Sequence, residues 1–129
     1  MSDPVVPVSW GELLDKVAIL EIKRHRLRAP DAVTNAEREL AALAPALALL
    51  EPAPAGLAEA RSALAAVNQR LWTIEDRIRE HESAGDFGPG FVALARSVYL
   101  ENDERGRIKR AINVAMGSGL VEEKQYAAY

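Results

Sequence analysis

Polar side chains interrupt the apolar face of the segment RSVYLENDERGRIKRAIN, residues 96–113. At helical spacing, Val98 and Ile112 mark a face that packs against other helices, yet Asn102 and Arg105 fall on that same face. A charge on the core side of a helix is costly unless it is paired and hydrogen-bonded. The pattern therefore predicts either a buried polar network that fixes the register of the helices or a pocket that holds a polar ligand.

A row of polar and aromatic side chains on another segment matches this interruption. Asn68, Trp72 and Glu75 follow one another at spacings of four and three residues, beside the apolar stripe of the segment 57–84. Guanidinium and ammonium groups, with an amide and an aromatic wall, suit an anionic small molecule. The residues predicted to bind such a ligand are Asp15, Lys16, Asn68, Trp72, Glu75, Arg96, Tyr99, Asp103 and Lys109.

Two pairs of acidic residues suggest a second chemistry. Glu12 with Asp15, and Glu101 with Glu104, each place two carboxylates about one helical turn apart. All-α nucleotide pyrophosphatases use such pairs to hold magnesium against a triphosphate, because carboxylates at this spacing can share a hard cation. The alternative hypothesis is therefore a magnesium-dependent hydrolase of this type, although acid pairs at this spacing are common on helix surfaces.

The composition argues against several other chemistries. The chain has 129 residues and no cysteine, which rules out disulfides, thiolate zinc sites and cysteine nucleophiles. The two histidines, His25 and His81, have no partner at metal-ligand spacing, so neither a metal nor a cofactor is predicted. The net charge of -3 argues against nucleic acid as a partner. No apolar run is long enough for a membrane span or an export signal, so we expect a cytoplasmic protein.

The spacing of apolar residues predicts an all-α fold of about four helices, and no segment shows the alternation of a strand. The expected helices span residues 9–28, 32–50, 57–84 and 90–116. Because the connections are short, the helices should pack as an antiparallel bundle in a single domain, 1–129. An extended arm, 1–8, precedes the bundle, and a tail, 117–129, follows it.

Local signals set the expected helix ends. Ser9 and Glu12 form a capping box at the start of the first helix, and Asp31 or Thr34 is expected to start the second. Pro45 predicts a kink or break near residue 44, because proline removes a backbone hydrogen bond and clashes with the preceding turn.

The first helix and the tail bear on possible partners. Apolar residues cover more than half the circumference of the segment 9–28, which predicts either a central position in the bundle or contact with a second copy, as in a homodimer, or with a partner protein. The tail contains Tyr126 and Tyr129 but no helical stripe. We expect it to fold back over the polar site as a lid.

Several motifs together resemble a family of small uncharacterised bacterial proteins, a domain of unknown function. The motifs are SWGELLDK at 9–16, LEIK at 20–23, VNQRLWTIEDRI at 67–78, LARSVYLEND at 94–103, IKRAIN at 108–113 and LVEEKQY at 120–126. The resemblance brings no established reaction. It implies a link to surface-polysaccharide metabolism, since the genes of relatives sometimes lie near glycosyltransferase genes. Among anionic small molecules, the resemblance therefore favours a glycan precursor as the ligand.

The positions that match the family's motifs are mostly polar, and they lie on the first, third and fourth helices and on the tail. They include all nine predicted ligand-binding residues, together with Glu12, Lys23, Asp76, Asn102, Asn113, Glu122, Lys124 and Tyr126. Ala18 stands where the family has a threonine, which argues against a hydroxyl function at that turn. The main hypothesis is therefore a small binding or adaptor module with a polar inter-helical site, and a purely structural polar network in a protein-interaction module is a further alternative.

Overall fold

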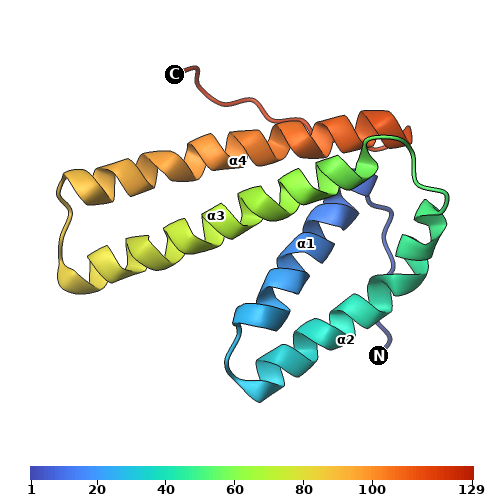
Figure 1. Cartoon of the computed structure of the whole chain (residues 1–129), viewed down its shortest axis with the longest axis horizontal. Coiled ribbons are helices and arrows are strands. Elements are labelled where there is room, and N and C mark those ends of the chain that lie inside the picture. Colours follow the sequence, from blue (N-terminus) through green and yellow to red (C-terminus); the bar gives the residue numbers. More distant parts are fainter.

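The computed structural model describes all residues, 1–129, and its regular structure is entirely helical (Figure 1). The elements are α1 (Trp10–Arg26), α2 (Pro30–Leu47), the short 3-10 helix η1 (Ala48–Leu50), α3 (Leu57–Ala84) and α4 (Pro89–Met116). The prediction of an all-α, bundle-like fold is confirmed. None of these helices has the combination of length and apolar character that a membrane span requires.

The helices are arranged around α1. α3 and α4 form a long antiparallel hairpin, and α1 packs across the half of this hairpin that lies away from its turn (Figure 1). α2 lies against α1 on the side away from α3 and α4. α1 therefore contacts all three other long helices, which is the central position that its apolar circumference predicts.

The hydrophobic core lies where α1 crosses the α3–α4 hairpin. Its buried side chains come from α1, η1, α3 and α4, and they are Leu14, Leu50, Leu57, Leu64, Val67 and Ile112. Each of these large aliphatic side chains contributes about 1.5 to 3 kcal/mol when it is fully buried. The core thus lies at the end of the long hairpin away from its turn, near the start of α1 and the end of α4.

The connection between α1 and α2 lies earlier in the sequence than predicted. α1 ends at Arg26, because Leu27 already has extended backbone with φ -67° and ψ 138°. α2 begins at Pro30, so the prediction that Asp31 or Thr34 caps this helix is wrong. Proline suits this first position, since the N–H that it lacks has no helical partner there.

Of the predicted kink or break near residue 44, the break does not occur, because α2 is continuous through Pro45. The helix continues through Pro45 to Leu47 and then tightens into η1, which ends at Leu50. The observed bounds of α3 equal the predicted ones, and α4 begins one residue before its predicted start.

The N-terminus of α1 is capped by residues from both ends of the chain. Ser9 Oγ accepts a hydrogen bond from the N–H of Glu12 (3.1 Å), as the capping box predicts. The N–H of Gly11 donates to Asn113 Oδ1 (2.7 Å), and the N–H before it donates to Ser118 Oγ (3.1 Å). The donors that every helix leaves open at its start are therefore largely satisfied by the C-terminal end of α4.

Candidate functional site

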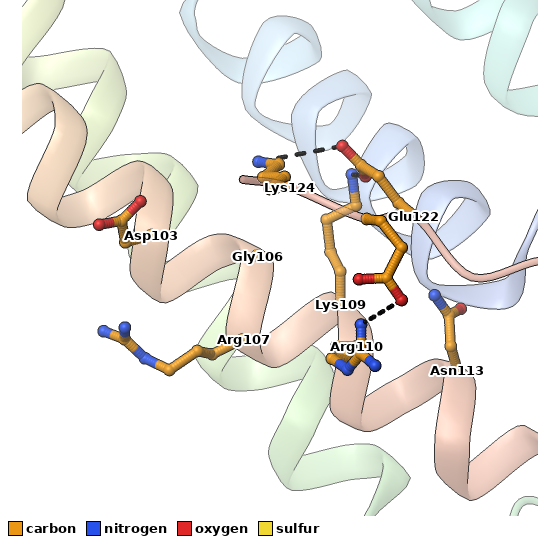
Figure 2. Close-up of a pocket in the computed structure, with 9 residues that line it drawn as sticks. Asp103, Gly106, Arg107, Lys109, Arg110, Asn113, Glu122 and Lys124 are labelled. Atoms are coloured by element: carbon orange, nitrogen blue, oxygen red, sulfur yellow. Dashed lines mark hydrogen bonds and ion pairs between the residues drawn. The ribbon is translucent and has the colours of Figure 1, made fainter. Parts of the chain in front are cut away.

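Lys109 is the centre of a polar cluster between α1, α4 and the C-terminal tail. Its side chain is only 9% exposed, and its Nζ lies 2.8 Å from Glu12 Oε2, 3.0 Å from Glu122 Oε2 and 3.7 Å from Asp15 Oδ2. Figure 2 shows Lys109 reaching from α4 towards Glu122 of the tail. Because Glu12 pairs with Lys109, its carboxylate does not complete the predicted capping box with Ser9.

The cluster continues from α1 to α3 through an amide. Asn68 Nδ2 donates a hydrogen bond to Asp15 Oδ1 (2.8 Å), and both residues are buried. Arg105 Nη1 in turn donates to Asn68 Oδ1 (3.3 Å). Lys109, Asp15, Asn68 and Arg105 thus link α1, α3 and α4, and we refer to these four residues with Glu12 as the polar network.

The charges around Lys109 stabilise its ammonium form. Burial by itself lowers the pKa of Lys109, but the hydrogen bonds to Glu12 and Glu122 and the charge of Asp15 outweigh it, so the pKa is raised. The same contact acts on the tail, because the hydrogen bond from Lys109 holds the pKa of Glu122 below its ordinary value. The ion pair is therefore stable across neutral pH.

Arg105 differs from Lys109 because no carboxylate lies within ion-pair distance of its guanidinium. One of its five N–H donors is used by Asn68, and its Nε is buried without any acceptor. A buried donor without a partner costs about 1 to 3 kcal/mol. Arg105 is therefore the group in this region that lacks an anionic partner.

Arg105 and Asn102 line two pockets on different sides of α4. The larger pocket, of about 990 Å³, lies between α4 and the tail, and we call it the Tyr99 pocket. It is lined by Val98, Tyr99, Asn102, Asp103, Arg105, Lys124, Tyr126, Ala127, Ala128 and Tyr129. The smaller one, of about 480 Å³, lies between α1, α3 and α4, and we call it the Trp72 pocket. It is lined by Ile19, Asn68, Leu71, Trp72, Glu75, Asp76, Arg79, Asn102 and Arg105.

The two pockets differ in charge. The Tyr99 pocket contains two cations, Arg105 and Lys124, and its one acidic residue, Asp103, accepts a hydrogen bond from the Tyr129 hydroxyl. In the Trp72 pocket, the cations of Arg79 and Arg105 are balanced by two carboxylates. The lining of the Tyr99 pocket therefore has one more basic than acidic side chain, whereas that of the Trp72 pocket has equal numbers of both.

The structure brings together seven of the nine predicted ligand-binding residues, in three groups. Asp15, Asn68 and Lys109 belong to the polar network, Tyr99 and Asp103 line the Tyr99 pocket, and Trp72, Glu75 and again Asn68 line the Trp72 pocket.

Lys16 and Arg96 do not join these groups. Lys16 is exposed, and its Nζ lies 2.6 Å from Glu39 Oε1 of α2. It therefore faces α2, which contributes no residue to the polar network. Arg96 is exposed on α4 and has no hydrogen-bond or ion-pair partner in the structure. Both residues lie on the correct helices but on faces that turn away from the pockets.

The predicted set omits three residues that matter in the structure, Arg105, Glu122 and Lys124. Arg105 had a clear signal, since it falls on the apolar face of its helix. Glu122 and Lys124 had none from periodicity, because the tail has no regular structure and its path over α4 depends on the folded surface.

The carboxylates that suggested a magnesium site each contact a basic side chain. Glu12 and Asp15 both face Lys109. Glu101 lies 2.9 Å from Arg70 Nε, and Glu104 lies 2.6 Å from Arg107 Nη2. The Lys109 ammonium therefore occupies the position between Glu12 and Asp15 that a bound cation would take.

The fold and the polar network define a small all-α protein in which a central helix is joined to a long helical hairpin through buried charges. The chain belongs to the family of unknown function DUF6165, whose family model matches residues 5–129. In the same comparisons, no curated protein and no solved structure matches the chain.

The pH is expected to change how the segment around Glu122 sits on α4. Since Lys109 holds the pKa of Glu122 below 4.5, the docked tail is fully stabilised above pH 4.5 and loses this contribution as the pH falls through the lowered value. We expect the NMR signals of residues 119–123 to sharpen towards those of an unfolded chain at low pH, while the contact between Tyr129 and Tyr99 still holds the end of the tail on α4. In Glu122→Gln the same signals should show no such step, and wild-type signals that do not change while the Glu122 carboxyl itself is titrated contradict the assignment.

Proposed function

We propose that this protein is a small binding module that takes an anionic small molecule in the Tyr99 pocket. The observation that carries the proposal is the state of Arg105, a half-buried cation with no carboxylate partner and with a buried Nε that has no acceptor. Lys124 adds a second cation to the same pocket. An anionic group of a ligand would pair with the part of the Arg105 guanidinium that is open to the pocket, and so supply the charge partner that the protein itself does not.

The size and lining of the pocket support a ligand larger than a simple ion. Ligand pockets typically enclose about 300 to 1,000 Å³ and combine apolar walls with a few polar groups that orient the ligand. The Tyr99 pocket, at about 990 Å³, combines tyrosine, valine and alanine side chains with Asn102 and Arg105. Sugar phosphates and sugar acids have this combination of an anionic group, hydroxyls and an apolar ring face, so a glycan precursor is the ligand class that we propose.

Binding by calorimetry tests this function. Glucose 1-phosphate and glucuronic acid are titrated into the full-length chain, with neutral glucose as the comparison. We expect the two anions to bind at millimolar concentration or tighter. Replacing Arg105 by Gln, which keeps a donor for Asn68 but removes the charge, should weaken binding by about 10- to 100-fold, because a hydrogen bond to a charged group is worth about 1.5 to 3 kcal/mol.

Arg96→Gln is the matched control for this experiment. It removes the same charge from the same helix, but at an exposed position outside both pockets. We expect its affinity to equal that of the wild type. Equal affinities of the Arg105 and Arg96 variants, or equal binding of glucose and glucose 1-phosphate, would exclude the Tyr99 pocket as an anion site.

A further inference from the structure

A third pocket, distinct from the Trp72 pocket, adjoins the Tyr99 pocket and shares Asp103 and Lys124 with it. Figure 2 shows the residues that line this third pocket. This cationic pocket, of about 250 Å³, is lined by no apolar residue. Its positive groups are Arg107, Lys109, Arg110 and Lys124, and its acidic groups are Asp103, Glu122 and Glu123. The surface along α4 therefore changes from a pocket with tyrosine walls to a pocket with four cations, and Lys124 stands at their boundary.

Two adjacent carboxylates of the tail occupy the cationic pocket. Glu122 Oε2 lies 3.0 Å from Lys109 Nζ, and Glu123 Oε1 lies 2.9 Å from Arg110 Nη1. Both side chains are partly exposed, and no backbone hydrogen bond joins residues 119–129 to the helices. The Glu123–Arg110 pair is exposed, and exposed ion pairs are weak and salt-sensitive, so a ligand with more negative charge can displace it. At Lys109, which is only 9% exposed, such a ligand would displace Glu122 alone, while Glu12 and Asp15 keep their contacts.

The tyrosines next to this pocket offer flat aromatic surfaces. The rings of Tyr99 and Tyr129 meet edge to face with their centroids 5.2 Å apart, and Tyr126 is 77% exposed. Aromatic rings bind well to such surfaces, and tyrosine side chains stack on nucleobases of any sequence. Arginine is the side chain best suited to phosphate, because its planar guanidinium donates two parallel hydrogen bonds.

We propose that the two pockets together bind an aromatic ring that carries two linked phosphates, which is the chemistry of a nucleoside diphosphate. The ring lies against Tyr99 and its neighbours in the tail, and the phosphates replace the carboxylates of Glu122 and Glu123 at Lys109 and Arg110. This inference rests on the proposed function, since it names the class of anion that the Tyr99 pocket takes. It also assigns the two glutamates as internal occupants of the phosphate positions.

The test compares whole and partial ligands on the full-length chain. Uridine diphosphate and adenosine diphosphate are titrated by calorimetry, alongside uridine and inorganic pyrophosphate. We expect both nucleotides to bind at least about tenfold more tightly than either fragment, since each part contributes its own contacts. Pyrophosphate that binds as tightly as the nucleotides overturns the role of the tyrosines.

Variants of the tail test the second half of the inference. The double variant Glu122→Gln and Glu123→Gln should bind the nucleotides about tenfold more tightly, because the competing carboxylates are gone, and Arg110→Gln should bind them about tenfold more weakly. Glu39→Gln, which removes an exposed carboxylate on α2, is the matched control and should change nothing. Melting temperatures are recorded for each variant, so that a loss of fold is seen separately.

The outcomes separate the two proposals. Unchanged or weaker nucleotide binding in the double glutamine variant overturns the assignment of Glu122 and Glu123. If glucose 1-phosphate still binds in an Arg105-dependent manner while nucleotides bind no better than pyrophosphate, the proposed function stands and the nucleotide inference falls. If no anion binds, both fall.

Discussion

Replacing Lys109 by Met is expected to lower the free energy of unfolding by about 3 to 5 kcal/mol, the usual cost of removing one partner from a buried ion pair. Methionine preserves most of the volume of the lysine side chain but removes its charge. Glu12 and Glu122 are partly exposed and can turn to solvent, but the Asp15 side chain is only 7% exposed and keeps Asn68 as its one partner. Urea unfolding followed by circular dichroism measures the change.

Two further variants show whether the charge of Asp15 is the cause. In the double variant Lys109→Met with Asp15→Asn, the uncompensated buried charge is gone, so part of the lost stability should return. Lys16→Met removes an exposed lysine whose pair with Glu39 is worth only about 0 to 1 kcal/mol. If the Lys109 and Lys16 variants lose similar stability, the polar network does not hold α1 on α4.

Replacing Gly11 by Ala is expected to destabilise the fold by about 2 to 4 kcal/mol, through overpacking and the loss of a helix cap. A Cβ at position 11 would lie 2.5 Å from the carbonyl oxygen of Lys109 and 2.9 Å from Asn113 Oδ1. Because the nearest obstacle is backbone, a rotamer change cannot relieve the clash, and α1 must move away from α4. The hydrogen bond from the Gly11 N–H to Asn113 is then lost as well.

The sign of this effect is informative in itself. Alanine is a better helix former than glycine by about 1 kcal/mol, so a Gly11→Ala change without a steric conflict should stabilise the protein. Gly119→Ala is the control, since a Cβ there meets nothing within 4 Å. A Gly11→Ala variant with a raised melting temperature would show that α1 and α4 do not approach as closely as the structure has them.

The fold could be predicted from the sequence where periodicity and a terminal signal agree. α3 has a long apolar repeat and ends before Gly85, which takes the left-handed backbone with φ 65°, and its predicted bounds hold at both ends. At the start of α2 two polar residues looked like caps, yet Pro30 begins the helix. Pro30, Asp31 and Thr34 each can start a helix, and the sequence does not say which of them does. The choice depends on where the chain has to turn to place α2 against α1.

The sequence identified the helices that carry the candidate site, but only some of the residues on them that line it. Asn102 and Arg105 stood out because they fall on the apolar face of α4, whereas Arg96 lies six residues before Asn102 on an exposed face. Which face of a long helix is covered depends on where a third helix crosses it, and α1 covers only one half of the α3–α4 hairpin. Lys16 lies outside the two pockets for a related reason, since the side of α1 that carries Lys16 faces α2 and not α3 or α4.

The cap at the start of α1 ties the first helix to the order of protein synthesis. The residues that satisfy its opening N–H groups, Asn113 and Ser118, follow their partners by 102 and 108 positions. On the ribosome, α1 emerges before α4, so two of the acceptors for its first turn are made only after α1 itself. The nascent chain therefore has only Ser9 as a side-chain cap for α1 until Asn113 and Ser118 have emerged, and a product that stops before residue 113 lacks the groups that dock this helix onto α4.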